Sequence, residues 1–135
     1  MPKVKVHTVD ARERYRIIGE LFEVITNLKT KQEVINFLVG LLTSSEALMI
    51  ARRLQIAKML INEDGYDIIK KKLRVSHQTI ASVEKWLQRD DDKRKIIIRK
   101  IKEIEKSAEA KNSSRYSGNL LDRYAQHRFL KDIFE

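Results

Sequence analysis

The scarcity of proline and glycine is the feature that most restricts how this chain can fold. One proline, Pro2, and four glycines occur in 135 residues. Sandwiches and barrels of β-strands need turn residues about every 8–12 residues, whereas long helices need few. We therefore expect an all-α fold. A domain takes roughly 100–200 residues, so the length predicts one domain with room for an appendage.

Composition excludes several classes of function. The chain has no cysteine, which excludes a disulfide framework, a thiolate metal site and a cysteine nucleophile. The three histidines are isolated in the sequence, so we expect no metal site. The sequence has no glycine-rich loop that could bind a phosphate and no G-x-S-x-G nucleophile elbow. We expect a protein that is not an enzyme.

The formal charge of +9 favours a polyanionic partner, with nucleic acid ahead of an acidic membrane. The longest uncharged stretch, 34–45, is shorter than the roughly 20 residues of a membrane-spanning helix. Lys3 and Lys5 are not followed by the apolar region of a signal peptide. We expect a cytoplasmic protein that does not bind membranes.

Capping residues predict where the first three helices begin. Three residues have the pattern of an N-cap with a glutamate three positions later: Asp10, Thr30 and Thr43. These signals predict helices over 11–28, over 31–42, and from 44 to near Gly65, where glycine would supply a left-handed closing residue.

The first two helices are broadly apolar for their length, and such a surface needs either a large core or a second chain. We expect a homodimer that buries the apolar residues of these helices: Ile18, Leu21, Ile25, Val34, Phe37 and Leu41.

A helix-turn-helix is predicted next, from a short helix over 66–73, a turn at Arg74 and Val75, and a helix capped by Ser76 that runs to about Arg89. Its apolar positions all point one way, and its outer face offers small and polar side chains. The residues expected to read DNA bases are Ser76, His77, Gln78, Ala81 and Ser82. Those expected to contact phosphates are Lys70, Lys71, Lys72, Arg74 and Lys85.

A plain helical hairpin with a solvated basic face is the alternative to this helix-turn-helix. Arg74 weighs toward it, because the turn usually carries glycine, and a non-glycine residue in a left-handed conformation is strained.

The composition changes near residue 91. We divide the chain into a dimerisation and helix-turn-helix domain, 1–90, and a basic helical extension, 91–135. The extension is predicted to contain a helix over 91–110, a polar linker over 112–118 and a last helix over 120–134. The stripe Ile97, Ile101 and Ile104 is expected to pack against the last helix or against the dimer core. An acidic membrane is the other candidate surface for this stripe.

The run LFEVITNLKTKQEVINFLVGLLTSSEALMIARRLQIAKML, followed by a helix-turn-helix that ends in WL, resembles the Trp repressor family over roughly residues 15–88. The resemblance implies an all-α homodimer whose N-terminal helices interlock, and double-stranded DNA as the partner. The extension 91–135 is not part of the family pattern.

In tryptophan-binding members of that family, two arginines sandwich the indole of the ligand. The resemblance places Arg53 at the first arginine, Thr43 at a pocket threonine, Ser82 at the second arginine and Trp86 at a ligand-binding serine. It thus implies an effector pocket of Thr43, Arg53, Ser82 and Trp86. Tryptophan is not expected as corepressor, because the missing guanidinium removes half of the cation–π stack. Trp86 is expected either to fill the pocket itself or to be an ordinary core residue.

The sequence therefore favours a DNA-binding transcriptional regulator, with repression as the favoured direction, that acts as a homodimer on a near-palindromic site and has no cofactor. The alternative is an RNA- or protein-binding adaptor in which the helical tail is the interaction element.

Overall fold

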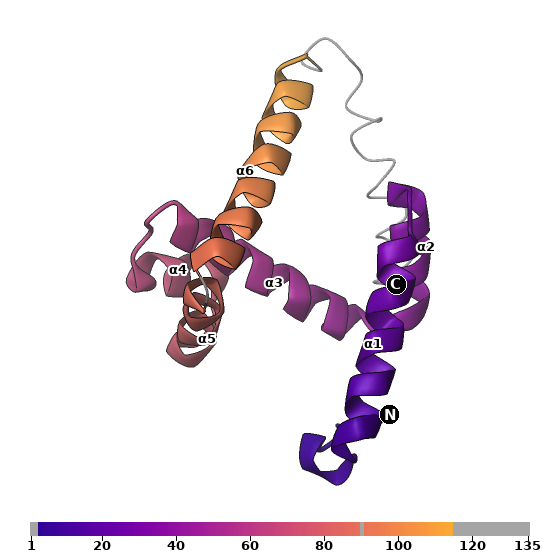
Figure 1. Cartoon of the computed structure of the whole chain (residues 1–135). Helices are drawn as coiled ribbons and strands as arrows, with labels where there is room; N and C mark the ends of the chain where they lie inside the picture. Colours follow the sequence, from indigo (N-terminus) through magenta and orange to yellow (C-terminus); the bar gives the residue numbers. More distant parts are fainter. Residues whose placement is uncertain (1–2, 90, 115–135) are drawn as a thin grey trace. The chain divides into compact units, whose positions relative to one another are not determined.

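The structure is a computed structural model that describes residues 3–89 and 91–114, and all secondary structure in these ranges is helical. The elements are a short 3-10 helix η1 (Val6–Thr8) and the α-helices α1 (Ala11–Asn27), α2 (Lys31–Leu41), α3 (Ser44–Ile61), α4 (Tyr66–Leu73), α5 (His77–Gln88) and α6 (Asp91–Ser114) (Figure 1). The predicted all-α fold is confirmed. The last predicted helix, 120–134, lies outside the described residues. Among the helices that the structure describes, none is long and apolar enough to cross a membrane.

Reciprocal capping boxes begin α2 and α3, as the sequence predicts. The backbone N–H of Glu33 donates to Thr30 Oγ1 at 3.1 Å, and the backbone N–H of Thr30 donates to the Glu33 carboxylate at 3.3 Å. The corresponding distances for Glu46 and Thr43 are 3.2 Å and 2.8 Å. Each box satisfies two backbone donors that a helix start otherwise leaves without a partner.

Two details of the helix ends differ from the prediction. Asp10 caps α1 by a single bond from the backbone N–H of Arg12, at 3.1 Å, in place of a reciprocal box with Glu13. Gly65 does not close α3 in a left-handed conformation. It is extended, with φ −69°, and is the N-cap of α4. Glu63 takes the left-handed position, with φ 63°.

The described residues divide into two units, one within Met1–Leu42 and the other within Thr43–Glu135. In the first unit, which contains η1, α1 and α2, none of the residues described is buried. Phe22 is 60% exposed and Leu41 is 53% exposed, while Leu21, Val34 and Phe37 are half-buried. The apolar side chains of α1 and α2 thus lack a core of their own in the single chain.

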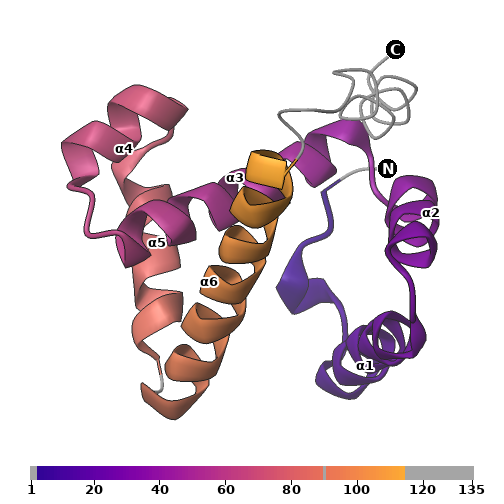
Figure 2. The same cartoon turned by 90° about the horizontal axis from the view of Figure 1, so that it is seen from above.

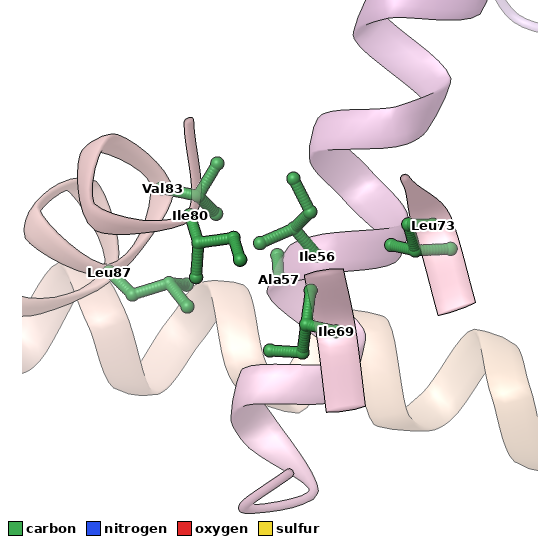
Figure 3. Packing of buried hydrophobic residues seen from close by; sticks show 7 residues of the cluster. All are labelled: Ile56, Ala57, Ile69, Leu73, Ile80, Val83 and Leu87. Carbon is green, nitrogen blue, oxygen red and sulfur yellow. The ribbon is translucent and has the colours of Figure 1, made fainter. Parts of the chain in front are cut away.

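The second unit has a true core, formed where α3, α4 and α5 meet. Seven side chains converge there: Ile56 and Ala57 from α3, Ile69 and Leu73 from α4, and Ile80, Val83 and Leu87 from α5 (Figure 3). Val75, in the turn between α4 and α5, packs against this cluster. The predicted inward-facing set of the helix-turn-helix is therefore confirmed.

Helix α6 packs on this unit. It contacts α5, and Figure 2 shows it crossing α3. Ile101 is buried, and Lys58 Nζ of α3 lies 3.7 Å from Glu105 Oε1. Ile97 is half-buried and Ile104 is exposed, so only part of the predicted isoleucine stripe is covered in the single chain.

Candidate nucleic-acid interface

Helices α4 and α5 are joined by a tight turn that Arg74 makes possible. Arg74 is the C-cap of α4 and adopts a left-handed conformation, with φ 54° and ψ 46°. Its backbone N–H donates to the carbonyl oxygen of Lys70 at 2.9 Å. The chain thus accepts a conformation that glycine would adopt with less strain. The turn has the geometry of a helix-turn-helix although it carries no glycine.

The buried and exposed residues of α5 lie on opposite sides of the helix. Successive residues of an α-helix are rotated by about 100°, so Ile80, Val83 and Leu87 fall within one arc of about 60°. The predicted DNA-facing residues of α5 fall within an arc of about 140° centred on the other side: His77, Gln78, Ala81, Ser82 and Lys85. All of these are exposed except Ala81, which is half-buried. A helix held by one face and bare on the other can enter a groove.

The first turn of α5 is fixed by local contacts. The backbone N–H of Thr79 donates to Ser76 Oγ at 3.2 Å, so the Ser76 hydroxyl already caps the helix. The His77 ring lies against the Tyr66 ring, with centroids 4.9 Å apart. Gln78 is exposed and forms no side-chain hydrogen bond to another described residue. Gln78 therefore has a donor and an acceptor that no described residue occupies.

The predicted phosphate-binding cations belong to α4, to the turn after it and to α5. Those of α4 and of the turn are consecutive or nearly so, and Lys85 lies on α5 itself. All five predicted phosphate contacts are exposed: Lys70, Lys71, Lys72, Arg74 and Lys85. None of them forms an ion pair with a described residue. The three lysines also lie in the last turn of α4, where they complement the negative end of the helix dipole.

Tyr66 and Glu84 form a contact that the sequence analysis missed. The Tyr66 hydroxyl, at the start of α4, donates a hydrogen bond to the carboxylate of Glu84 on α5. This bond, with smaller contributions from burial and from the charge of Glu84, raises the pKa of Tyr66 above its usual value. The contact ties the two helices together on the side away from Arg74. Eighteen residues separate the pair, so no local pattern could have revealed it.

The residues expected to form an effector pocket are divided among other roles. Thr43 Oγ1 caps α3, and Arg53 and Ser82 are exposed. Trp86 is 46% exposed and lines a hollow together with residues of α6. Thr43, Arg53 and Ser82 do not line this hollow. Within the single chain, Trp86 is not part of the buried cluster of α3, α4 and α5, and the expectation that its indole fills a family pocket stays a prediction.

Among the residues that the structure describes, no group of three or more histidine, aspartate or glutamate side chains is placed to hold a metal ion.

Comparison with known proteins gives two matches. The profile of the Trp repressor protein family matches residues 17–102. An uncharacterized protein of Bacillus subtilis (strain 168), YerC, is 30% identical over 98 residues, which cover 73% of this chain and 94% of the relative. No solved structure matches the chain significantly. The family match extends past α5 into the first half of α6.

Proposed function

Because this chain belongs to the Trp repressor family, we propose that it is a sequence-specific DNA-binding transcriptional regulator, in the role of a repressor, that acts as a homodimer on a near-palindromic site. Membership in a family of regulators supports the general class of DNA-binding regulator. The residues of the second unit support the proposed way in which this chain binds DNA.

The observation that carries this proposal is the bare face of α5, together with exposed cations of α4, the turn and α5 that form no ion pair with a described residue. The opposite face of α5 is anchored in the core by Ile80, Val83 and Leu87. The exposed face presents an amide, an imidazole, a hydroxyl and a methyl group, which suit the donors, acceptors and thymine methyl of the major groove. The cations on α4 and at Arg74 can meet the phosphates on either side of that groove.

Gln78 and Lys71 have different roles in this proposal. Gln78 lies in the first turn of α5, where side chains of a recognition helix reach base edges, and its amide can pair bidentately with adenine. Lys71 lies on the supporting helix α4 and has a single flexible ammonium group. In this proposal it contacts a phosphate and no base.

The exposed apolar residues of α1 and α2 support a homodimer. A two-fold axis would present two copies of α5 about one helical turn of DNA apart, and this spacing favours a near-palindromic target.

We propose that tryptophan is not the corepressor. Ser82 stands where a tryptophan-binding member has its second arginine, and Thr43 already uses its hydroxyl as a helix cap.

Selection of bound sequences from a random duplex pool, followed by titration of the selected site and of random DNA across a salt series, tests the function. Gln78→Ala should reduce the preference for the selected site by about 1–3 kcal/mol and leave the salt slope unchanged. Lys71→Ala should weaken binding to both DNAs alike and flatten the slope by about 0.9. Equal losses on both DNAs for Gln78→Ala would show that α5 does not read bases.

Preference for RNA over duplex DNA, or no binding to duplex DNA at low salt, would contradict the proposal and favour the adaptor alternative.

A further inference from the structure

The side chain of Tyr66, at the start of α4, follows one edge of α5. Its ring packs against the imidazole of His77, with ring centroids 4.9 Å apart and ring planes inclined by 56°. Its hydroxyl donates a hydrogen bond to the carboxylate of Glu84. His77 and Glu84 are seven residues apart on α5, which separates them by about 10 Å along the helix axis and by about 20° around it. One side chain of α4 thus contacts two turns of the helix that is proposed to read DNA.

Tyr66 is anchored on more than one side. Its hydroxyl is held by Glu84, and its side chain packs against the core of α3, α4 and α5. Tyr66 and Glu84 are both half-buried. The raised pKa of Tyr66 agrees with a hydrogen bond that the neutral hydroxyl donates and that the phenolate would lose. The ring of Tyr66 is therefore a fixed support for the residue that lies against it.

The residue that lies against this support is His77, which is exposed on α5. Among the described residues, the imidazole of His77 has no hydrogen-bond or ion-pair partner, so its ring nitrogens are available to a base. An exposed side chain loses rotamer freedom when it binds, and this loss weakens binding. A ring that already packs against Tyr66 has less freedom to lose.

We infer that Tyr66 is a positioning residue for base reading: its ring, anchored by Glu84, holds the imidazole of His77 in one orientation on the exposed face of α5. The inference rests on the proposed function, because His77 is one of the side chains proposed to read bases. Tyr66 and Glu84 act through His77 and contact no base themselves. Loss of either should lower discrimination at the base pair that His77 reads and at no other.

Nuclear magnetic resonance of the free chain tests whether Glu84 acts on His77 through Tyr66. The chain has three histidines, and the ring signals of His77 are those that His77→Gln removes. The ring current of Tyr66 should displace these signals, and the two rings should give a cross-peak. Glu84→Ala should reduce both effects, although residue 84 lies two turns from His77. Glu84→Gln should restore them, because its amide oxygen can still accept from the Tyr66 hydroxyl.

Further variants separate positioning from a general loss of structure. Tyr66→Leu should abolish both effects, and Glu84→Ala added to Tyr66→Leu should not change the His77 signals further. Gln88→Ala is the matched control, because Gln88 is exposed on α5 one turn after Glu84 and on the same edge of the helix. It should leave the His77 signals unchanged. Circular dichroism checks that the helices of each variant are intact.

Titration of the selected DNA site and of its single-base variants tests the effect on base reading. His77→Ala identifies the base pair that His77 reads, as the position where discrimination falls. Glu84→Ala should lower discrimination at that base pair by about twofold to tenfold relative to Glu84→Gln, the effect of ordering one free side chain on binding. The two variants have the same charge, so general attraction to DNA cancels in this comparison. Discrimination at the other base pairs should be equal in both.

Two results would overturn the inference. Unchanged His77 signals in Glu84→Ala would show that Glu84 does not hold Tyr66 against His77. No loss of discrimination, or an equal loss at every base pair, would show that Tyr66 and Glu84 only brace α4 against α5. If the chain does not bind duplex DNA, the proposed function fails, and the His77 signals of the free chain still decide whether Tyr66 holds the imidazole.

Discussion

At the scale of single residues, the two left-handed positions carry the most information. Glu63 and Arg74 have φ values of 63° and 54°, in a region that glycine occupies with less strain. Glu63 closes α3 in a Schellman motif, in which the backbone N–H of Asp64 donates to the carbonyl oxygen of Met59 at 3.0 Å. Arg74 closes α4 beside the proposed DNA face. Both pay a similar conformational cost, but only Arg74 has a proposed role in binding.

Arg74→Gly should therefore stabilise the protein and weaken its DNA binding. Relief of the left-handed strain should raise the free energy of unfolding by about 1 kcal/mol, and loss of a phosphate contact should flatten the salt slope by about 0.9. Glu63→Gly is the matched control and should stabilise to a similar extent with no effect on DNA binding. Chemical denaturation and DNA titration measure the two quantities. If Arg74→Gly leaves the salt slope unchanged, Arg74 does not contact phosphate.

The hydrogen bond from Tyr66 to Glu84 should make stability depend on pH in the alkaline range. The raised pKa of Tyr66 means that the folded chain holds this proton more tightly than the unfolded chain, whose tyrosine titrates near the usual 10.0. The stabilisation is thus fully present below about pH 10 and is lost as the pH rises through the raised pKa. Thermal unfolding of the original chain and of Tyr66→Phe should differ at neutral pH and converge in strong alkali. Tyr15→Phe, at a residue that is 81% exposed, should show no such difference at any pH.

At the scale of helices, the sequence predicted the starts of the helices better than their ends. A start is marked by a side chain that bonds to the backbone three residues on, as Thr30, Thr43 and Ser76 do, and such a signal is local and chemical. An end depends on which residue tolerates φ > 0. Glycine is only the commonest residue in that conformation. The sequence therefore points to Gly65 as the left-handed residue that closes α3, whereas Glu63 has that conformation in the structure. The contacts of Tyr66 and of Trp86 join separate helices, and helical periodicity carries no information on such pairs.

Helix α6 offers a matched test of how firmly it is docked. Ile101 is 8% exposed and Ile104, three residues later on the same helix, is 65% exposed. Ile101→Ala should lower the free energy of unfolding by about 2 kcal/mol or more, as for other buried large-to-small substitutions. Ile104→Ala should change it by less than about 0.5 kcal/mol. Denaturant titration of both variants checks this, and a harmless Ile101→Ala would show that α6 does not belong to the folded unit in solution.

At the scale of the whole molecule, the two units differ in how complete they are. The second unit buries a core formed by α3, α4 and α5, whereas the described residues of the first unit leave apolar side chains of α1 and α2 open to water. Exposed apolar surface of this extent is typical of an interface with another chain. Sequence periodicity identified these residues as apolar faces, but periodicity within one helix carries no information about a second surface.

The full chain should therefore sediment at twice its mass of 15.9 kDa at micromolar concentration. Ile18→Glu and Leu41→Glu should each shift the equilibrium toward the monomer, because both side chains are about half exposed in one chain and a charge buried between two chains is costly. Ile68→Glu changes an equally exposed residue of α4 and should leave the dimer intact. A stable, folded monomer of the original chain at that concentration would contradict the proposal.

The absence of any buried side chain among the described residues of α1 and α2 has a consequence for gene dosage. If the apolar faces of α1 and α2 are buried only against a second copy, a newly made chain has one proposed DNA-binding unit. It cannot form the two-fold dimer until other copies accumulate. Occupancy of a two-fold site would then rise with the square of the chain concentration while copies are few. Such a regulator would respond to a doubling of its own synthesis more steeply than a monomer could, without any ligand.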